Sequence, residues 1–436
     1  MNIFNSILEL NGYPIRKSLR LLERLNGLSG EEFKSFQIKS MRECLEHHVK
    51  TTPAFREMYG KIDPLSVRWE SLPVMTKSIY QKEKNKLISD EYISLPLFRN
   101  STSGSSGIPM QFVKDKPCHA MVWAHIIGSY RGRGLEYGKS LQGRFYGMPL
   151  NSRKAFWKEK VKDCLSARVR FSAHDLGVSA RKKILECFGR NDFTYVYGYA
   201  NTLALFSRHM MDEGVCVKGV CPSIKCVIYT SEVCTEDDRK VIEAAFGVRL
   251  YSEYGSSELG VLSFEDDKGR HVANDRQFFF EVLDESDEPV PDGLIGKLVV
   301  TSLFNRAMPF IRYELGDRAA LARDGSRLYI HQLEGRTGEL IKLPSGASVP
   351  SFALYTSTKT VTSKFPEIKE YYIKQTACDE LTFELVVDGE LHQAIERSVR
   401  ETTKVFLPGE MRIQVRKVKE VQRTEAGKMR HFESCI

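Results

Sequence analysis

The stretch "IKCVIYTSEVCTEDDRKVIEAAFGVRLYSEYG" (Ile224–Gly255) decides the fold class. Its apolar, β-branched start predicts a strand, and Thr235 with Asp238 forms a capping box that opens a helix. Gly247 ends this helix, and Val248–Tyr251 predicts a second strand. A strand, a helix and a strand in this order form a β-α-β unit. The stretch therefore predicts a parallel or mixed sheet covered by helices.

The rest of the chain falls into regions of different pattern. Residues 1–90 are mainly helical, whereas strand-like and helix-like segments alternate from about residue 91 to residue 330. The C-terminal region combines strand-like segments with a helix whose apolar positions share one face, at Leu391, Ile395, Val399 and Phe406. That region predicts a small α+β domain.

A glycine-bearing, charged segment, "EGRTGELIKLPSG", interrupts the pattern near Gly335 and marks the expected domain junction. We therefore predict an α/β protein with a large N-terminal domain over residues 1–334, in which β-sheets are flanked by helices. A small C-terminal α+β domain follows over residues 335–436. The 436 residues, 42% of them hydrophobic, suffice for both domains.

Charge and cysteine usage narrow the class of protein. The net charge is only +8 and both signs are mixed along the chain, so no nucleic-acid partner is expected. No segment reaches the roughly 18 apolar residues of a membrane span, and the N-terminus lacks a secretion-signal pattern, so we expect a cytoplasmic protein with reduced thiols. One group of cysteines matches no zinc spacing: Cys216, Cys221, Cys226 and Cys234.

The segment "STSGSSG" (Ser101–Gly107) lies between two short apolar segments and predicts a loop joining two strands. Such a loop can hold phosphate through hydroxyls and backbone N–H groups, here those of Thr102, Ser103, Gly104, Ser105, Ser106 and Gly107. No lysine follows the last glycine, which argues against a Walker-type loop. A flexible turn or linker is the alternative interpretation.

The segment "YSEYGSSELG" (Tyr251–Gly260) follows the second strand of the β-α-β unit, at the end where open α/β sheets bind ligands. It offers an aromatic ring, two hydroxyls and a carboxylate, from Tyr254, Ser256, Ser257 and Glu258. These groups suit a nucleotide bound with Mg²⁺. A turn with a solvated glutamate is the alternative.

Three further segments carry polar residues suited to the same ligand. In "MPFIRYELGDRA", Asp317 follows a glycine turn that closes a strand-like run, where a carboxylate can accept bonds from ribose hydroxyls. In "GRTGELIK", Arg336 provides a donor fork for ribose or phosphate. In "QRTEAGKMRHF", Lys428 lies in a loop near the C-terminus. The alternatives are a surface turn for Asp317 and a solvated surface charge for Lys428.

Taken together and in this order, these segments resemble the core motifs of the adenylate-forming ligases, which include acyl-CoA and aryl-CoA synthetases, luciferases and peptide-synthetase adenylation domains. The resemblance covers most of the chain. "LPVMTK", "GKLVVTSLFNRAMPFIRY" and the compact C-terminal domain are most similar to the phenylacetate-CoA ligase branch, including the CapK-type proteins of capsule and surface-polysaccharide clusters. The resemblance implies the adenylate-forming ligase fold with a mobile C-terminal domain.

The same resemblance implies ATP and Mg²⁺ as cofactors and a role for each segment. The Ser101–Gly107 loop matches the loop that holds the β- and γ-phosphates of ATP. Glu258 matches the Mg²⁺ ligand, and Lys428 matches the catalytic lysine that bridges the substrate carboxylate and the α-phosphate. Contacts to adenine or AMP are implied for Glu232, Tyr254, Gly255, Ser256, Ser257, Asp317 and Arg336.

Parts of the sequence depart from the family pattern. The hinge position, usually Asp or Lys, is Gly338, which permits rotation but removes a hinge salt bridge. "TSEV" (Thr230–Val233) keeps only Glu232 of the Gly-Gly/Ala-Glu-Pro segment. The acyl-pocket segment does not resemble a fatty-acid tunnel, which favours a small or aromatic acid, or an amino or hydroxy acid; it offers Tyr197, Tyr199 and Asn201.

Three functions are compatible with these residues. The first activates a small carboxylic acid as an acyl-adenylate with release of pyrophosphate and transfers the acyl group to an amine or hydroxyl acceptor, as in CapK-type proteins; "TSGSSGIP" and "IKLPSGASVP" favour it slightly. The second transfers the acyl group to CoA. The third is a nucleotide-binding protein without catalysis, which has no need of both Glu258 and Lys428. A homodimer is compatible with each.

Overall fold

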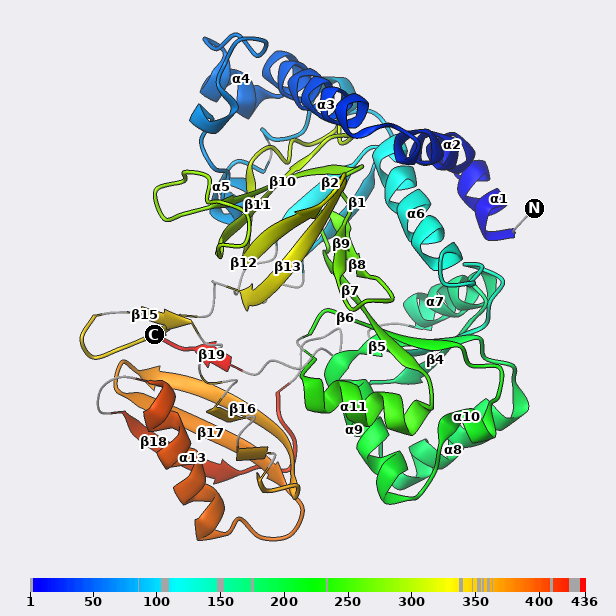
Figure 1. The fold of residues 1–436 in the computed structure, drawn as a ribbon, viewed down its shortest axis with the longest axis vertical. Coiled ribbons are helices and arrows are strands. Elements are labelled where there is room, and N and C mark those ends of the chain that lie inside the picture. The colour runs from blue at the N-terminus through cyan, green and yellow to red at the C-terminus, as the bar shows by residue number, and fades with distance from the viewer. Residues whose placement is uncertain are drawn as a thin grey trace. The chain divides into compact units, whose positions relative to one another are not determined.

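The computed structural model describes the chain apart from residues 1–2, 85, 103–109, 147–152, 174–175, 233, 337–339, 347, 351–353, 355–356, 359–360, 363, 408–410 and 423–431. The described residues divide into two compact units, residues 1–333 and residues 334–436 (Figure 1).

The first unit is built on an 11-stranded sheet with the strand order β10-β11-β12-β13-β9-β8-β7-β6-β5-β3-β4 (Figure 1). Strands β4, β3, β5, β6 and β7 pair in parallel, whereas the pairs from β7 to β8, β8 to β9 and β10 to β11 are antiparallel. The predicted α/β class is confirmed. The bounds are β3 (Gln142–Tyr146), β4 (Arg168–Ser172), β5 (Tyr195–Tyr199), β6 (Cys226–Thr230), β7 (Arg249–Ser256), β8 (Gly260–Glu265), β9 (His271–Ala273), β10 (Phe278–Leu283), β11 (Gly296–Ser302), β12 (Tyr313–Asp324) and β13 (Arg327–Arg336).

The predicted β-α-β unit is present as β6, α11 (Glu236–Phe246) and β7. The backbone N–H of Asp238 donates to Thr235 Oγ1 at 2.9 Å, and the Asp238 carboxylate accepts in return from the Thr235 N–H, so the capping box is formed. Gly247 ends the helix with φ +68°, a conformation that favours glycine. Strand β7 continues beyond the predicted end, as far as Ser256.

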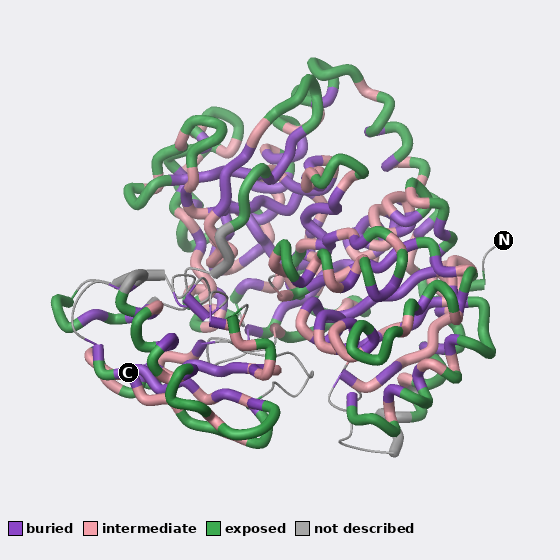
Figure 2. The backbone as a smooth tube through the Cα atoms, turned by 60° about the horizontal axis from the view of Figure 1, so that its bottom comes forward, coloured by how far each residue is buried: buried purple, intermediate pink, exposed green. Residues whose placement is uncertain are grey.

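Helices cover both faces of the parallel strands. Helices α8, α9 and α11 pack their apolar side chains on one face, over Phe145, Val227 and Leu250. Helices α1, α2 and α6 pack on the other face, over Tyr195, Ile228 and Val261. Strand β5 is buried along its whole length and β6 at all residues but one, and Figure 2 shows such buried segments inside the first unit. The bounds are α1 (Ile3–Leu10), α2 (Ile15–Asn26), α6 (Lys116–Arg131), α7 (Arg153–Leu165), α8 (Val178–Arg190), α9 (Ala200–Asp212) and α10 (Val217–Val220).

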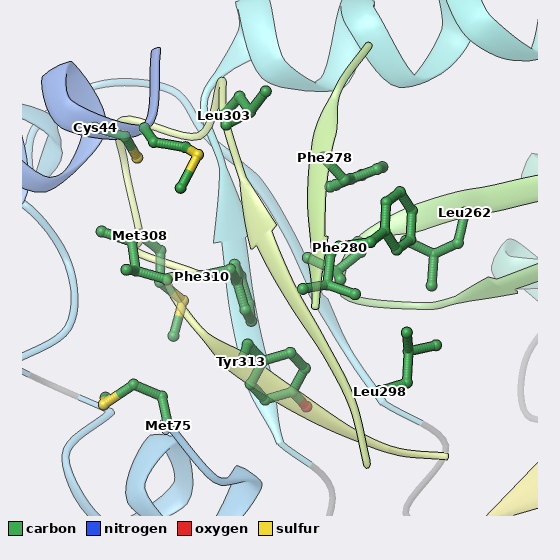
Figure 3. Close-up of a cluster of buried hydrophobic side chains, with 14 of the residues drawn as sticks. Cys44, Met75, Leu262, Phe278, Phe280, Leu298, Leu303, Met308, Phe310 and Tyr313 are labelled. Carbon is green, nitrogen blue, oxygen red and sulfur yellow. The ribbon is translucent and has the colours of Figure 1, made fainter. Parts of the chain in front are cut away.

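The antiparallel strands share a third core with the helical N-terminal region, as Figure 3 shows. Met75, from "LPVMTK", forms a bridge to Tyr313, from "MPFIRYELGDRA", and Tyr80 stacks on Phe310 with ring centroids 5.0 Å apart. Two segments that we singled out in the sequence are therefore neighbours. The helices of this region are α3 (Gly30–Thr51), α4 (Pro53–Tyr59), η1 (Trp69–Ser71), α5 (Lys77–Lys82) and η2 (Asp90–Tyr92).

Arg312, next to this bridge, is a fully buried arginine, with 1% of its surface exposed. Its Nη1 donates to the carbonyl oxygen of Glu70 at 2.7 Å and also to that of Leu72, and its Nε lies 3.2 Å from Glu281 Oε1. The Glu281 carboxylate also accepts from Trp69 Nε1 at 3.2 Å. Arg312 thus ties the N-terminal helical region to strands β10 and β12.

The second unit is the predicted α+β structure. Its sheet has the order β18-β17-β16-β19, with α13 (Gln393–Phe406) supplying Ile395 and Val399 to the core. A two-stranded sheet, β14 with β15, belongs to the same unit. The bounds are β14 (Leu340–Lys342), β15 (Ser348–Pro350), β16 (Ile368–Ala377), β17 (Glu380–Val387), β18 (Arg412–Lys417) and β19 (Phe432–Ser434).

Within the described ranges, no helix combines the length and the apolar character needed to cross a membrane. The described residues also contain no cluster of three or more His, Cys, Asp or Glu side chains placed to hold a metal ion. The cysteines Cys216, Cys221, Cys226 and Cys234 therefore do not form such a cluster.

Candidate active site

The ends of three parallel strands bring predicted site residues to one edge of the large sheet. The registers pair Thr230 of β6 with Tyr199 of β5 and with Glu253 of β7. Because these three residues are aligned across neighbouring strands, the segments that follow them leave the sheet side by side. These segments contain Asn201 after β5, Glu232 after β6 and the turn after β7. Open α/β sheets bind their ligands at this edge.

The first contact at this edge joins Tyr254 to Asp317. The Tyr254 hydroxyl donates to Asp317 Oδ2 at 2.5 Å, although the two residues are 63 positions apart in the chain. The Tyr254 ring is half-buried and packs against the core shown in Figure 3. The structure thus places an aromatic ring next to a carboxylate, the pair that we predicted for adenine and ribose.

Asp317 does not follow a strand that closes at Gly316, so this part of the prediction is wrong. Strand β12 continues to Asp324, and the register shows Leu315–Asp317 opposite the single residue Leu298 of β11. Gly316 has φ +80°, which allows the extra residues to form a bulge. The reason for the error is that pairing with β11 continues on both sides of the glycine.

Glu258 is buried rather than solvated, with 6% of its surface exposed. Its Oε1 accepts a hydrogen bond from the hydroxyl of Tyr313 at 3.0 Å, and Tyr313 itself is fully buried. The alternative of a turn with a solvated glutamate is therefore wrong. A buried carboxylate held by a hydroxyl is a fixed oxygen donor.

The turn around Glu258 is tight. A Cβ on Gly255 would lie 2.3 Å from the carbonyl oxygen of Gly260, so only glycine fits there. Ser256 Oγ accepts the backbone N–H of Leu259 at 3.2 Å, and Ser257 is exposed. Ser257 is therefore the hydroxyl of this turn that a ligand can reach.

The base of the predicted phosphate loop lies close to Glu258. Strands β1 (Phe98–Ser101) and β2 (Gln111–Lys114) pair antiparallel on either side of the loop, as predicted. Thr102 and Met110 then join in two hydrogen bonds of 2.9 Å. The Tyr313 hydroxyl lies 4.0 Å from Met110 Sδ, so Tyr313 contacts both the loop base and Glu258.

Two residues that we did not single out in the sequence support this arrangement. One is Tyr313, which lies inside the quoted "MPFIRYELGDRA". The other is Lys114, whose Nζ donates to the carbonyl oxygen of Leu259 at 3.0 Å. Burial lowers the pKa of Lys114. Lys114 joins β2 to the Glu258 turn, 145 positions away, and nothing local in the sequence indicates that contact.

Glu232 and Asn201 also meet. Glu232 Oε2 accepts the backbone N–H of Asn201 at 2.9 Å, near the N-terminus of α9. A carboxylate there satisfies a helix N–H group that lacks an intrahelical partner. The structure thus links the segment predicted to contact adenine to the start of the helix in the predicted acyl-pocket segment.

Tyr197 and Tyr199 point to one face of β5, since they are two residues apart in a strand. Both are buried, at 8% and 2% exposed. The Tyr197 hydroxyl donates to Glu253 Oε1 at 2.8 Å, and the Tyr199 ring packs on Tyr146 with centroids 4.2 Å apart.

The comparisons with known proteins agree with this fold. No protein-family model matches the chain. A crystal structure of 2-hydroxyisobutyryl-CoA ligase in the postadenylation state, with a bound acyl-AMP, superimposes with a TM-score of 0.69 over 93% of this chain and 90% of that chain, at 15% identity. The chain has the adenylate-forming ligase fold.

Two curated relatives share parts of this sequence. The chain is 31% identical to a phenylacetate-coenzyme A ligase of Thermus thermophilus over 40% of this chain and 39% of the relative. It is 28% identical to the indoleacetate–lysine synthetase of Pseudomonas savastanoi over 35% of this chain and 36% of the relative. The matched regions thus span well under half the length of these curated relatives.

Several predicted residues lie outside the described part of this adenylate-forming ligase fold. They are Ser103, Gly104, Ser105, Ser106 and Gly107 of the loop, Gly338 of the hinge and Lys428. Arg336 is the last residue of β13, and its side chain also lies outside the described part of the structure.

The donor set at the Glu258 turn fits Mg²⁺. Mg²⁺ binds proteins through one or two carboxylates and completes its shell with water and substrate phosphates. Glu258 is a fixed carboxylate near the loop base, and the described residues add no cluster of further acidic ligands. Glu258 is therefore the residue that would hold the ion.

Proposed function

We propose that this chain is an AMP-forming carboxylate ligase. It would convert ATP and a small carboxylic acid into an acyl-adenylate and pyrophosphate, and then pass the acyl group to an acceptor. The observation that supports the proposal is the hydrogen bond from Tyr254 to Asp317, because it brings together an aromatic ring and a carboxylate from two separate segments, the groups proposed to bind adenine and ribose.

In the first step, an oxygen of the acid attacks the α-phosphorus of ATP, and the bond from that phosphorus to the bridging oxygen breaks, so pyrophosphate leaves. Tyr254 would stack on adenine and Asp317 would accept the ribose hydroxyls. Mg²⁺ held by Glu258 would supply positive charge at the phosphates. The Ser101–Gly107 loop would orient the β- and γ-phosphates.

The same proposal assigns a separate role to each domain. Residues 1–334 would form the adenylation core, and residues 335–436 would carry Lys428 to the α-phosphate. Rotation near Gly338 would then remove the lysine and admit the acceptor. Closure would also protect the acyl-adenylate from water.

For the acceptor, CoA is the better-supported candidate, and this reverses the slight preference drawn from the sequence phrases. Among the similar proteins, a phenylacetate-coenzyme A ligase and the 2-hydroxyisobutyryl-CoA ligase both carry CoA in their names. An amine or hydroxyl acceptor, as in CapK-type proteins, is the second candidate, favoured by the similarity to indoleacetate–lysine synthetase.

The proposal is tested by screening pooled small carboxylic acids for pyrophosphate release with ATP and Mg²⁺. We expect at least one acid to give release above the rate without acid. A protein that binds ATP but releases no pyrophosphate with any acid would instead be the catalytically inactive nucleotide-binding protein.

With the best acid, mass spectrometry of reactions with and without CoA identifies the acceptor. Stoichiometric acyl-CoA supports CoA, whereas an acyl-adenylate that persists until an amine is added supports the second candidate.

Replacement of Ser103, Ser105 and Ser106 by alanine is expected to raise the KM for ATP and to change the free energy of unfolding by less than about 1 kcal/mol, because the loop offers almost no apolar surface to a core. Initial rates at varied ATP and thermal unfolding check both parts. An unchanged KM, or a variant that unfolds, would show that the loop is structural.

A further inference from the structure

A half-buried arginine, Arg144, lies among the tyrosines of the predicted acyl pocket. Arg144 lies on β3 directly opposite Tyr197 of β5 in the parallel register. Its guanidinium carbon lies 4.8 Å from the centroid of the Tyr197 ring and 4.4 Å from that of Tyr146. The guanidinium therefore makes cation–π contacts with two aromatic rings.

The guanidinium of Arg144 has no acceptor among the residues that the structure describes. Across the described residues it makes no hydrogen bond or ion pair to a protein group, and its Nε is buried without a partner. Arg170 and Arg312 also have a buried Nε without a hydrogen-bond partner, but their guanidinium groups form ion pairs, with Asp163 at 2.9 Å and with Glu281. An unpaired buried donor such as this Nε is costly, so an acceptor from outside the described residues is expected.

Glu253 is the carboxylate that could neutralise Arg144, but its hydrogen bonds go elsewhere. Its oxygens accept from the Tyr197 hydroxyl at 2.8 Å and from the Tyr130 hydroxyl at 3.5 Å, and no ion pair within 4.0 Å joins it to Arg144. Burial raises the pKa of Glu253, while Arg144 acts in the opposite direction. Glu253 therefore anchors the Tyr197 ring and leaves the guanidinium fork open.

The position of Arg144 fits the far end of an acyl group. Tyr146 and Tyr199 stand two residues further along β3 and β5, towards the strand ends with Asn201. Two residues in a strand span roughly 6–7 Å. An acid whose reacting carboxylate lies at the strand ends would thus reach the guanidinium with a group several bonds away.

We propose that Arg144 binds a second anionic group of the acid, so that the substrate class is dicarboxylic acids. This proposal rests on the ligase function proposed above. The planar fork would bind the distal carboxylate through two parallel hydrogen bonds, which the tyrosine rings pre-orient. The other carboxylate would remain at the strand ends to attack ATP. Acids that lack the distal charge would leave the donors unpaired.

The test compares acids matched in length, such as glutarate with valerate and 4-carboxyphenylacetate with phenylacetate, by kcat/KM for pyrophosphate release. The wild type should prefer the dicarboxylate by at least about tenfold, the effect of a hydrogen bond to a charged group. Arg144→Gln should reduce this preference at least about tenfold, and Arg144→Lys should reduce it less. Arg190→Gln, at an exposed arginine of α8, is the matched control and should keep the preference.

Binding measured without turnover separates this proposal from the ligase function. Calorimetry with glutarate in the absence of ATP should show acid binding to the wild type and a loss of at least about tenfold in Arg144→Gln. If Arg144→Gln does not fold, Arg144→Lys should still weaken glutarate relative to valerate. Equal use of both acids in each pair by the wild type would overturn the role of Arg144 and leave the ligase function intact. If no acid of the screen gives pyrophosphate release, the ligase function is overturned. Calorimetry would then still decide whether Arg144 binds the dicarboxylate.

Discussion

Replacement of Lys428 by alanine is expected to reduce acid-dependent pyrophosphate release by at least about 10²-fold, the usual effect of losing one preorganised donor to a transition state. The attack of a carboxylate on the α-phosphorus brings two anions together, and the lysine would neutralise them only in the closed state. Its loss should therefore leave ATP affinity nearly unchanged. Initial-rate assays and calorimetry measure the two quantities.

Lys404→Ala is the matched control for this prediction. Lys404 is an exposed lysine in the last turn of α13, in the same unit, so its removal should alter neither quantity. Undiminished pyrophosphate exchange in Lys428→Ala would show that the catalytic assignment of this lysine is wrong. A parallel loss in both variants would point to a general effect of charge in this unit.

Arg312→Ala is expected to lower the free energy of unfolding of the first unit by about 3–5 kcal/mol, the effect of breaking a buried ion pair. Among the described residues, the substitution leaves the buried Glu281 carboxylate with the Trp69 indole as its remaining hydrogen-bond donor, and leaves the carbonyl oxygens of Glu70 and Leu72 without their shared donor. Tryptophan fluorescence isolates this unit, because all tryptophans of the chain lie in it, at Trp69, Trp123 and Trp157.

An exposed pair serves as the control for Arg312. Arg318 bonds to Glu285 at 2.6 Å, but the Glu285 side chain is 76% exposed, so Arg318→Ala should cost less than about 1 kcal/mol. Removing Glu281 as well as Arg312 should cost less than the sum of the single changes, since the unpaired charge is then gone. If Arg312→Ala lowers the free energy of unfolding no more than Arg318→Ala does, the buried arginine does not stabilise the unit.

Local patterns predicted much of the fold. The β-α-β unit could be derived because its helix begins at a capping box and ends at Gly247, and both signals act within a few residues. The C-terminal unit followed from strand runs and an amphipathic helix in the same way. The bulge that holds Asp317 could not be predicted, because it depends on where β11 pairs with β12.

In the candidate site, too, some residues could be predicted from local sequence and others could not. Glu258, Tyr254 and Asp317 lie in segments with distinctive composition, so their types and order could be interpreted from the sequence. The contacts of Lys114 and Arg144 could not, because each depends on a partner from a distant strand, Leu259 for one and Tyr197 for the other. Only the register of the sheet brings these residues together.

The most direct test of the central claim follows the oxygen atoms of the acid. The best substrate of the screen, labelled with ¹⁸O in its carboxylate, is incubated with ATP, Mg²⁺ and the acceptor, and the nucleotide product is analysed by mass spectrometry. Attack of the carboxylate on the α-phosphorus places one acid oxygen in AMP, and later cleavage of the acyl bond leaves it there. We predict AMP carrying one ¹⁸O atom. Unlabelled AMP, or ADP with labelled phosphate, would contradict the account.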